Sequence, residues 1–257
     1  MNLTPDSFSD GSPAYEDVGY QLRRAKSLID DGADALDLGG ESTRPGHQPV
    51  SAEEEWRRLR PVLRALRSAY PDTPISVDTY KVSTAEKALA EGADIINDVW
   101  GLSLDERLAA VVKDAGAGLI CMFNEDGDPT QPVGMGAMRE FFARALALAS
   151  RVGIDSSQVL MDPGLGFRVQ GQSIWRVLTH LADLRGSGAG LLVGHSRKRF
   201  LGEATGVTEA GERDLATAVI SALAALGGAD VLRVHNVGAT RQALALARWW
   251  GAANGPD

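Results

Sequence analysis

Polar side chains follow a series of short apolar runs along this chain. Carboxylates end two of these runs, at Asp78 and Asp162, and the amide of Asn97 ends a third. A carboxylate accepts two hydrogen bonds side by side, and an amide both donates and accepts. Gathered in one place, these groups would recognise a heterocycle with an amino group and a ring N–H. On spacing alone, the alternative is an internal salt bridge between Asp162 and Lys198.

A second kind of chemistry is indicated by two cationic side chains near the C-terminus. Arg233 and His235 are two residues apart, so on a strand both project from the same face. Arginine presents a fixed fork of donors that suits phosphate oxygens, and a phosphate favours the protonated form of a neighbouring histidine. The pair therefore predicts an anion site, although two surface groups finishing a strand would look the same.

Two stretches rich in small and polar residues have the composition of loops that close over a ligand. Residues 2–11 surround a lone Phe8, and residues 39–46 surround Arg44. Taken alone, both would be ordinary turns.

The elements that must position these groups alternate regularly. A Gly-Ala phrase recurs and precedes five of the apolar runs, each of which follows a segment with helical spacing. The predicted strands cover residues 35–38, 74–78, 95–96, 119–122, 159–162, 191–193 and 231–234. The predicted helices cover residues 16–31, 52–69, 81–91, 104–115, 136–152, 172–185, 210–227 and 238–250. This order is typical of a parallel sheet with helices outside it, in which functional groups lie at the carboxyl ends of the strands.

The length of 257 residues fits an α/β fold of the (β/α)8 TIM-barrel type, at about 32 residues per unit. The pattern nevertheless contains eight helices and only seven strands, so we expect that the first strand is missing from this sequence. No linker or low-complexity tract interrupts residues 1–257, which predicts a single domain. A doubly wound open sheet is the competing fold.

Composition limits the function classes. Lys and Arg number 26 against 34 Asp and Glu, a net charge of −8 that argues against a nucleic-acid partner. Cys121 is the single cysteine, so neither an internal disulfide nor a cysteine zinc site is expected. The sequence shows no signal peptide or apolar run long enough for a membrane span. We therefore expect a cytoplasmic protein without a membrane partner.

With these motifs in order, the chain resembles the dihydropteroate synthases of the pterin-binding barrel family. The resemblance runs through the whole chain and rests on seven phrases. They span residues 2–11, 40–46, 76–79, 96–98, 162–167, 194–202 and 233–235.

The resemblance implies a transferase of folate synthesis. Such enzymes condense 6-hydroxymethyl-7,8-dihydropterin diphosphate with 4-aminobenzoate, and the products are 7,8-dihydropteroate and diphosphate. It implies a pterin ring bound in the barrel mouth by Asp78, Asn97, Met122, Asp162 and Lys198. The 4-aminobenzoate would be bound by Pro45, Phe167, Ser196 and Lys198.

The resemblance also implies how the diphosphate is held. Arg44, Arg233 and His235 would bind it with support from Thr43, and Mg²⁺ would be the cofactor, with Asn2 as its protein ligand. Catalytic roles would fall to Arg44, Lys198, Arg233 and His235. Family members are commonly dimers, so a homodimer is expected.

Some phrases depart from the family pattern. Phe123-Asn124-Glu125 stands where a His-Met-Gln phrase is usual, Arg168-Val169-Gln170 replaces a Gly-Lys pair, and Asn236 stands where Asp is common. Two other functions stay open: a non-catalytic pterin-binding relative, and a methyltetrahydrofolate-dependent corrinoid methyltransferase.

Overall fold

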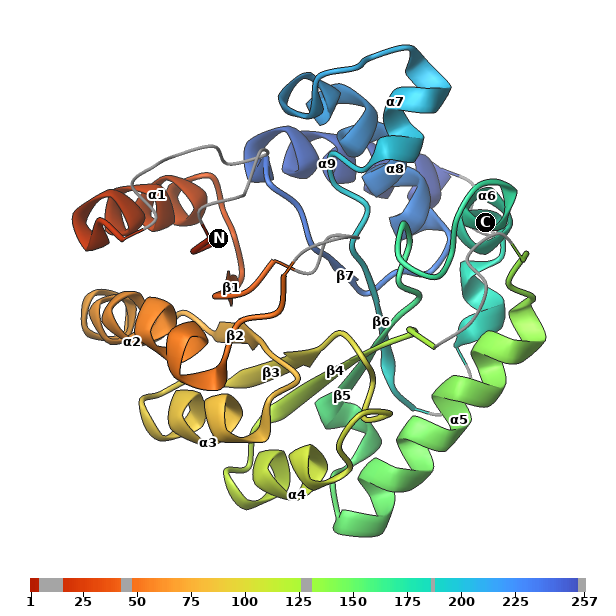
Figure 1. The fold of residues 1–257 in the computed structure, drawn as a ribbon. Coiled ribbons are helices and arrows are strands. Elements are labelled where there is room, and N and C mark those ends of the chain that lie inside the picture. Colours follow the sequence, from red (N-terminus) through yellow and green to blue (C-terminus); the bar gives the residue numbers. More distant parts are fainter. Residues whose placement is uncertain (5–15, 43–47, 126–130, 186–187, 254–257) are drawn as a thin grey trace.

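A curled parallel sheet enclosed by helices forms the body of the computed structural model, which describes residues 1–4, 16–42, 48–125, 131–185 and 188–253 (Figure 1). All seven strands are parallel and are hydrogen-bonded in chain order. The strands are β1 (Leu36–Gly39), β2 (Ile75–Asp78), β3 (Ile95–Asp98), β4 (Gly118–Met122), β5 (Val159–Asp162), β6 (Gly190–Val193) and β7 (Val231–Leu232). The predicted fold of TIM-barrel type, with seven parallel strands in this sequence, is thus confirmed.

Helices alternate with the strands and cover the outer face of the sheet (Figure 1). They are α1 (Val18–Asp30), α2 (Ala52–Ala69), α3 (Val82–Ala90), α4 (Arg107–Asp114), α5 (Met135–Val152), α6 (Gln172–Thr179), α7 (Arg199–Thr205), α8 (Asp214–Leu226) and α9 (Val237–Ala253). Short 3₁₀ turns occur at Ser156–Gln158, Leu181–Leu184 and Ala210–Arg213.

The structure differs from the predicted helices in two places. Helix α7 was not predicted, because its seven residues are too few to show a helical period. The predicted helix over 172–185 is interrupted: α6 ends at Thr179, and a separate 3₁₀ turn covers Leu181–Leu184.

Strand alternation divides the sheet residues between two faces. The outward residues, such as Leu38, Val77, Ile96 and Val193, are fully buried against the helices. The inward residues of neighbouring strands lie at matching levels, because the register pairs Asp78 with Gly39 and with Asn97. The inward face is therefore the one that carries the polar groups at the carboxyl ends.

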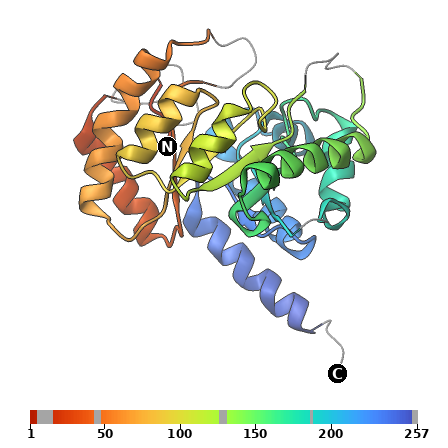
Figure 2. The same ribbon diagram turned by 90° about the horizontal axis from the view of Figure 1, so that it is seen from below.

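Strands β1 and β7 are the two edges of the sheet, and no pairing joins them among the described residues. A parallel bridge between Asn2 and Gly39 extends the β1 edge, with the amide of Leu3 donating to the Gly39 carbonyl at 2.8 Å. At the other edge, α9 projects from the body of the molecule (Figure 2). A cavity of about 1790 Å³ runs from the carboxyl ends of the strands to this seam.

Candidate functional site

The cavity at the carboxyl ends of the strands is lined by charged and polar side chains from many elements. Asp37 of β1, Asp78 of β2, Lys198 before α7 and Arg233 after β7 all line it. These groups are far apart in the sequence. The parallel order of the strands brings them to one end of the sheet, as the sequence predicts.

Arg233 is the central cation of this cavity. Its Nη1 lies 3.1 Å from Oδ2 of Asp37 and 3.6 Å from Oδ2 of Asp78, and its Nη2 lies 3.9 Å from Oδ2 of Asp162. Burial by itself would lower the pKa of Arg233, but the three carboxylates outweigh it and raise that pKa above its ordinary value. The guanidinium therefore stays charged and joins both edges of the open sheet.

Asp78 and Asn97 lie beside Arg233 on the inward face. Burial, and then the charge of Asp37, raise the pKa of Asp78 to about 8, while Arg233 opposes the shift. Asn97 is 1% exposed, and its side-chain N–H group has no hydrogen-bond partner among the described residues. An unsatisfied buried donor is costly, so an acceptor on a bound ligand would stabilise this position.

Asp162 is held by the loop that follows β5. Its Oδ1 accepts a hydrogen bond of 2.8 Å from the amide of Gly164, and its Oδ2 faces Arg233. Gly164 has a φ of +66°, and a Cβ there would lie 2.3 Å from the carbonyl oxygen of Phe123. A glycine is therefore required at this position to bring the loop under the carboxylate.

Lys198 enters the cavity from the loop between β6 and α7. Its Nζ donates to the carbonyl of Leu165 and lies 4.7 Å from the centre of the Phe167 ring. Burial lowers the pKa of Lys198 to about 8, with Asp162 opposing the shift and Arg233 adding to it. The salt bridge between Asp162 and Lys198, which was the alternative on spacing alone, is not the observed contact, since Asp162 faces Arg233 instead.

Ser196 and His235 connect the loops after β6 and β7. The amide of His235 donates to Oγ of Ser196 at 3.1 Å, and Nδ1 of His235 lies 2.8 Å from the same oxygen. This contact fixes the imidazole ring two residues beyond Arg233, and both residues line the cavity.

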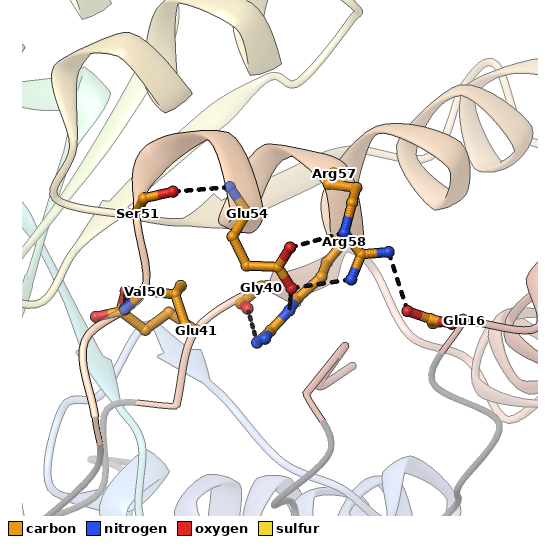
Figure 3. Close-up of polar contacts among 8 residues, drawn as sticks. All are labelled: Glu16, Gly40, Glu41, Val50, Ser51, Glu54, Arg57 and Arg58. Carbon is orange, nitrogen blue, oxygen red and sulfur yellow. Dashed lines mark hydrogen bonds and ion pairs between the residues drawn. The ribbon is translucent and has the colours of Figure 1, made fainter.

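The stem of the loop after β1 is tied to the protein by buried charges. Glu41 accepts hydrogen bonds from the amide of Val50 at 3.1 Å and from the hydroxyl of Tyr80 at 2.8 Å, and it pairs with Lys81. Arg58 of α2 donates to the carbonyl of Gly40 at 3.0 Å (Figure 3). These contacts fix the positions of Gly40, Glu41 and Val50, on either side of residues 43–47.

Comparisons with known proteins give the family. Residues 1–235 match the model of the pterin-binding enzymes. The chain belongs to this family. It is 41% identical over 241 residues to a dihydropteroate synthase of Staphylococcus haemolyticus, covering 92% of this chain and 88% of that protein.

Two solved structures show the same fold for this pterin-binding enzyme. A dihydropteroate synthase of Clostridium difficile, solved in the presence of pteroic acid, has a TM-score of 0.89 and 38% identity, covering 97% of this chain and 94% of that one. A dihydropteroate synthase of Xanthomonas albilineans with 4-aminobenzoic acid has a TM-score of 0.89 and 38% identity, covering 99% of this chain and 92% of that one. The family expected from the seven phrases is confirmed.

The structure of the pterin-binding chain brings most predicted site residues together. Those that it places at the carboxyl ends of the strands or on the loops that follow are Asn2, Asp78, Asn97, Met122, Asp162, Phe167, Ser196, Lys198, Arg233 and His235. Met122 is fully buried, beside Asp162 in the strand register. Thr43, Arg44 and Pro45 lie outside the described residues, as does Phe8.

Sequence reasoning gave no role to Asp37, although the structure of this family member places it closest to Arg233. Its signal was available, because Asp37 interrupts the apolar residues of the first predicted strand. Its partner, 196 residues away, could not be read from that pattern.

Proposed function

We propose that this chain is a dihydropteroate synthase, which condenses 6-hydroxymethyl-7,8-dihydropterin diphosphate with 4-aminobenzoate. The observation that carries the proposal is the cavity in which Arg233 lies within 3.9 Å of three carboxylates, beside the unsatisfied amide of Asn97. A pterin ring offers both the donors and the acceptors that this arrangement needs.

In this proposal, the pterin ring is bound by the polar groups of the inward face. The carboxylate of Asp162 accepts from the ring N–H and amino groups, and Asn97 donates to a ring acceptor. Met122 packs below the ring, and Asp78 and Lys198 complete the polar contacts. A ring without these donors would leave buried polar groups unpaired, so it would bind poorly.

The 4-aminobenzoate is proposed to bind higher in the cavity, on the loops after β5 and β6. Phe167 provides an apolar face, and Ser196 and Lys198 provide donors for the carboxylate. Pro45 completes this subsite, as the resemblance implies.

The diphosphate is proposed to bind on Arg233, His235, Arg44 and Thr43. Mg²⁺ would supply positive charge to the departing diphosphate, as a hard cation that prefers oxygen ligands. The described residues contain no group of three or more His, Cys, Asp or Glu side chains that could hold a metal ion. Asn2 lines the same cavity and its amide oxygen is a ligand of the kind that Mg²⁺ prefers, so Asn2 would be the protein residue that holds the ion.

The proposed reaction is a displacement assisted by fixed charges. The bond between the pterin methylene carbon and the diphosphate oxygen breaks first, and its electron pair leaves with the diphosphate. Arg233 and His235 stabilise that developing charge, while the buried carboxylates stabilise the pterin cation. The amine of 4-aminobenzoate then forms the new C–N bond and loses a proton. No side-chain nucleophile is required.

A coupled assay tests this function. The chain is incubated with pterin diphosphate and Mg²⁺, with and without 4-aminobenzoate, and diphosphate and dihydropteroate are both quantified. We expect the two products in equal amounts, dependent on 4-aminobenzoate. Tight pterin diphosphate binding by calorimetry without turnover would instead identify the non-catalytic relative, and methyl transfer from methyltetrahydrofolate would identify the corrinoid methyltransferase.

We also propose that the enzyme is a homodimer formed by α8 and α9. Leu215, Val219, Leu223 and Leu226 follow one face of α8 and are 49–78% exposed. The neighbouring α9 exposes Leu246, Trp249 and Trp250. Exposed apolar side chains on two neighbouring helices suit a second copy of the chain, because a two-fold axis brings identical patches together.

Sedimentation velocity tests the dimer. We expect the wild-type chain to sediment as a dimer and Leu215→Glu to sediment as a folded monomer, because each interface would receive two buried charges. A monomeric wild type at micromolar concentration would contradict the proposed interface.

Location and domain organisation complete the proposal. None of the described helices is long and apolar enough to cross a membrane. The lone Cys121 is buried, and burial raises the pKa of its thiol well above the ordinary value. We propose a single pterin-binding domain that works in the cytoplasm on small-molecule substrates, without a nucleic-acid partner.

A further inference from the structure

Two of the loops that carry the site are joined from behind by one carboxylate. Asp214, the first residue of α8, accepts hydrogen bonds from Arg197 in the loop after β6 and from Asn236 in the loop after β7. Neither Asp214 nor Asn236 is among the described residues that line the cavity. Asp214 therefore touches the two loops rather than the space that a substrate would occupy.

The contact with Arg197 is bidentate. Nε of Arg197 lies 2.7 Å from Oδ1 of Asp214, and Nη2 lies 2.9 Å from Oδ2. Both side chains are largely buried, at 16% and 22% exposed. A paired fork of this kind fixes orientation as well as distance.

Arg197 needs to be held, because its backbone is in an uncommon conformation. Its φ is +59°, in the left-handed region that residues other than glycine rarely adopt. Its amide donates to Oγ1 of Thr217 at 3.1 Å, and its carbonyl accepts from Arg213 at 3.0 Å. The residues on either side of it are Ser196 and Lys198, so this left-handed turn sets where both side chains project.

The contact with Asn236 reaches the other loop. Nδ2 of Asn236 donates to Oδ2 of Asp214 at 2.9 Å, and its Oδ1 accepts from the amide of Ala239 at 3.0 Å, at the start of α9. The residue before Asn236 is His235, which contacts Ser196. Asn236 uses both ends of its amide, and an Asp at this position would offer no donor to Asp214.

We propose that Asp214 is a positioning residue that sets Lys198 and Ser196 on one loop against His235 and Arg233 on the other. We call the contacts of Asp214 with Arg197 and Asn236 the clamp. The expected effect of the clamp on turnover rests on the proposed synthase activity, whereas its contacts are part of the structure. It also assigns a reason to Asn236, since the amide supplies the donor that the second limb of the clamp requires.

Two substitutions separate the limbs of the clamp. Asp214→Asn keeps the size of the side chain but removes the charge that faces Arg197. Asn236→Asp keeps an oxygen that caps α9 but replaces the donor that faces Asp214 with a second carboxylate. The matched control is Asp105→Asn, because Asp105 makes a bidentate pair with Arg107 on an exposed connection.

Amide hydrogen exchange and steady-state kinetics then test the proposal together. We expect Asp214→Asn to speed exchange in peptides covering both 194–198 and 233–236, and to lower kcat by about 10- to 100-fold, as misplaced reacting groups do. Asn236→Asp should speed exchange chiefly in 233–236. Asp214→Asn combined with Asn236→Asp restores a donor and an acceptor in exchanged positions, and should recover part of the lost kcat.

The outcomes distinguish the clamp from the proposed function. Unchanged exchange in either loop of Asp214→Asn, or wild-type kcat with both KM values unchanged, would overturn the clamp. Faster exchange in both loops of a chain whose wild type has no synthase activity would support the clamp and refute the proposed function. If Asp214→Asn does not fold, Arg197→Lys and Asn236→Asp test the two limbs separately by the same exchange measurement.

Discussion

Arg233 offers the sharpest test of how the open sheet is held together. Its side chain is 25% exposed, and its ion pair with Asp37 links the β7 edge to the β1 edge. Arg233→Ala would leave the carboxyl groups of Asp37, Asp78 and Asp162 without the guanidinium that lies between them. We therefore expect the substitution to reduce stability as well as turnover. The stability of the variant must be measured before a loss of turnover is assigned to the anion site.

The magnitude follows from the burial of the group. Removing one partner of a buried ion pair costs about 3 to 5 kcal/mol, because the remaining charge is uncompensated. Arg233 and Asp37 are each about a quarter exposed, so we expect the lower end, about 3 kcal/mol. For a chain of this length, that corresponds to a fall in Tm of about 6 to 12 °C.

Thermal unfolding of three variants measures the effect. Arg233→Ala should show the full loss, and Arg233→Lys a smaller one, because the charge remains but the fork is lost. Asp37→Asn in the Arg233→Ala background should recover part of the stability by removing one uncompensated charge. The control is Arg107→Ala, because an ion pair made by a side chain that is 80% exposed contributes little to stability. A Tm for Arg233→Ala equal to that of Arg107→Ala would refute the reasoning.

Three further predictions follow from the charged groups of the site. The pKa of Asp78 is about 8 in the folded chain and about 4 when unfolded, so the free energy of unfolding should fall as pH rises between these values. Urea unfolding at several pH values should show a smaller pH dependence of this free energy in Asp78→Asn than in the wild type. The pKa of Lys198, lowered to about 8, predicts that kcat/KM declines as pH rises through about 8, and Lys198→Arg should remove that limb if it retains measurable activity. Glu41→Gln should lower the free energy of unfolding by about 1 to 3 kcal/mol, because Lys81 loses its closest carboxylate; Glu53→Gln on the exposed start of α2 is the control, and equal Tm values for the two variants would contradict the prediction.

Much of the site was predictable because strand position is periodic in the sequence. Asp78, Asn97 and Asp162 end apolar runs, and parallel strands bring their ends to one edge. Alternation along a strand does not explain Arg233 and His235, because β7 ends at Leu232, but both residues line the cavity. Helix α7 was missed, since a segment of seven residues carries too little periodicity to separate it from a loop.

Other features depend on contacts that no local pattern encodes. Glu41, Tyr80 and Lys81 form a partly buried cluster across two loops, but nothing in the sequence distinguishes them from other polar residues. The left-handed conformation of Arg197 is likewise invisible in its residue type, since it is maintained by groups on α8 and the turn before it.

The sequence alone determined the family, the parallel order of the strands and the polar residues Asp78, Asn97 and Asp162 at the strand ends, because residue type and spacing are local properties. Only the tertiary structure decided which charges meet. Asp162 faces Arg233 rather than Lys198, Asp37 reaches across the seam to Arg233, and Asp214 joins two loops. These pairings arise from the curvature of the sheet, which sets distances between residues up to 196 positions apart and therefore cannot be read from spacing along the chain.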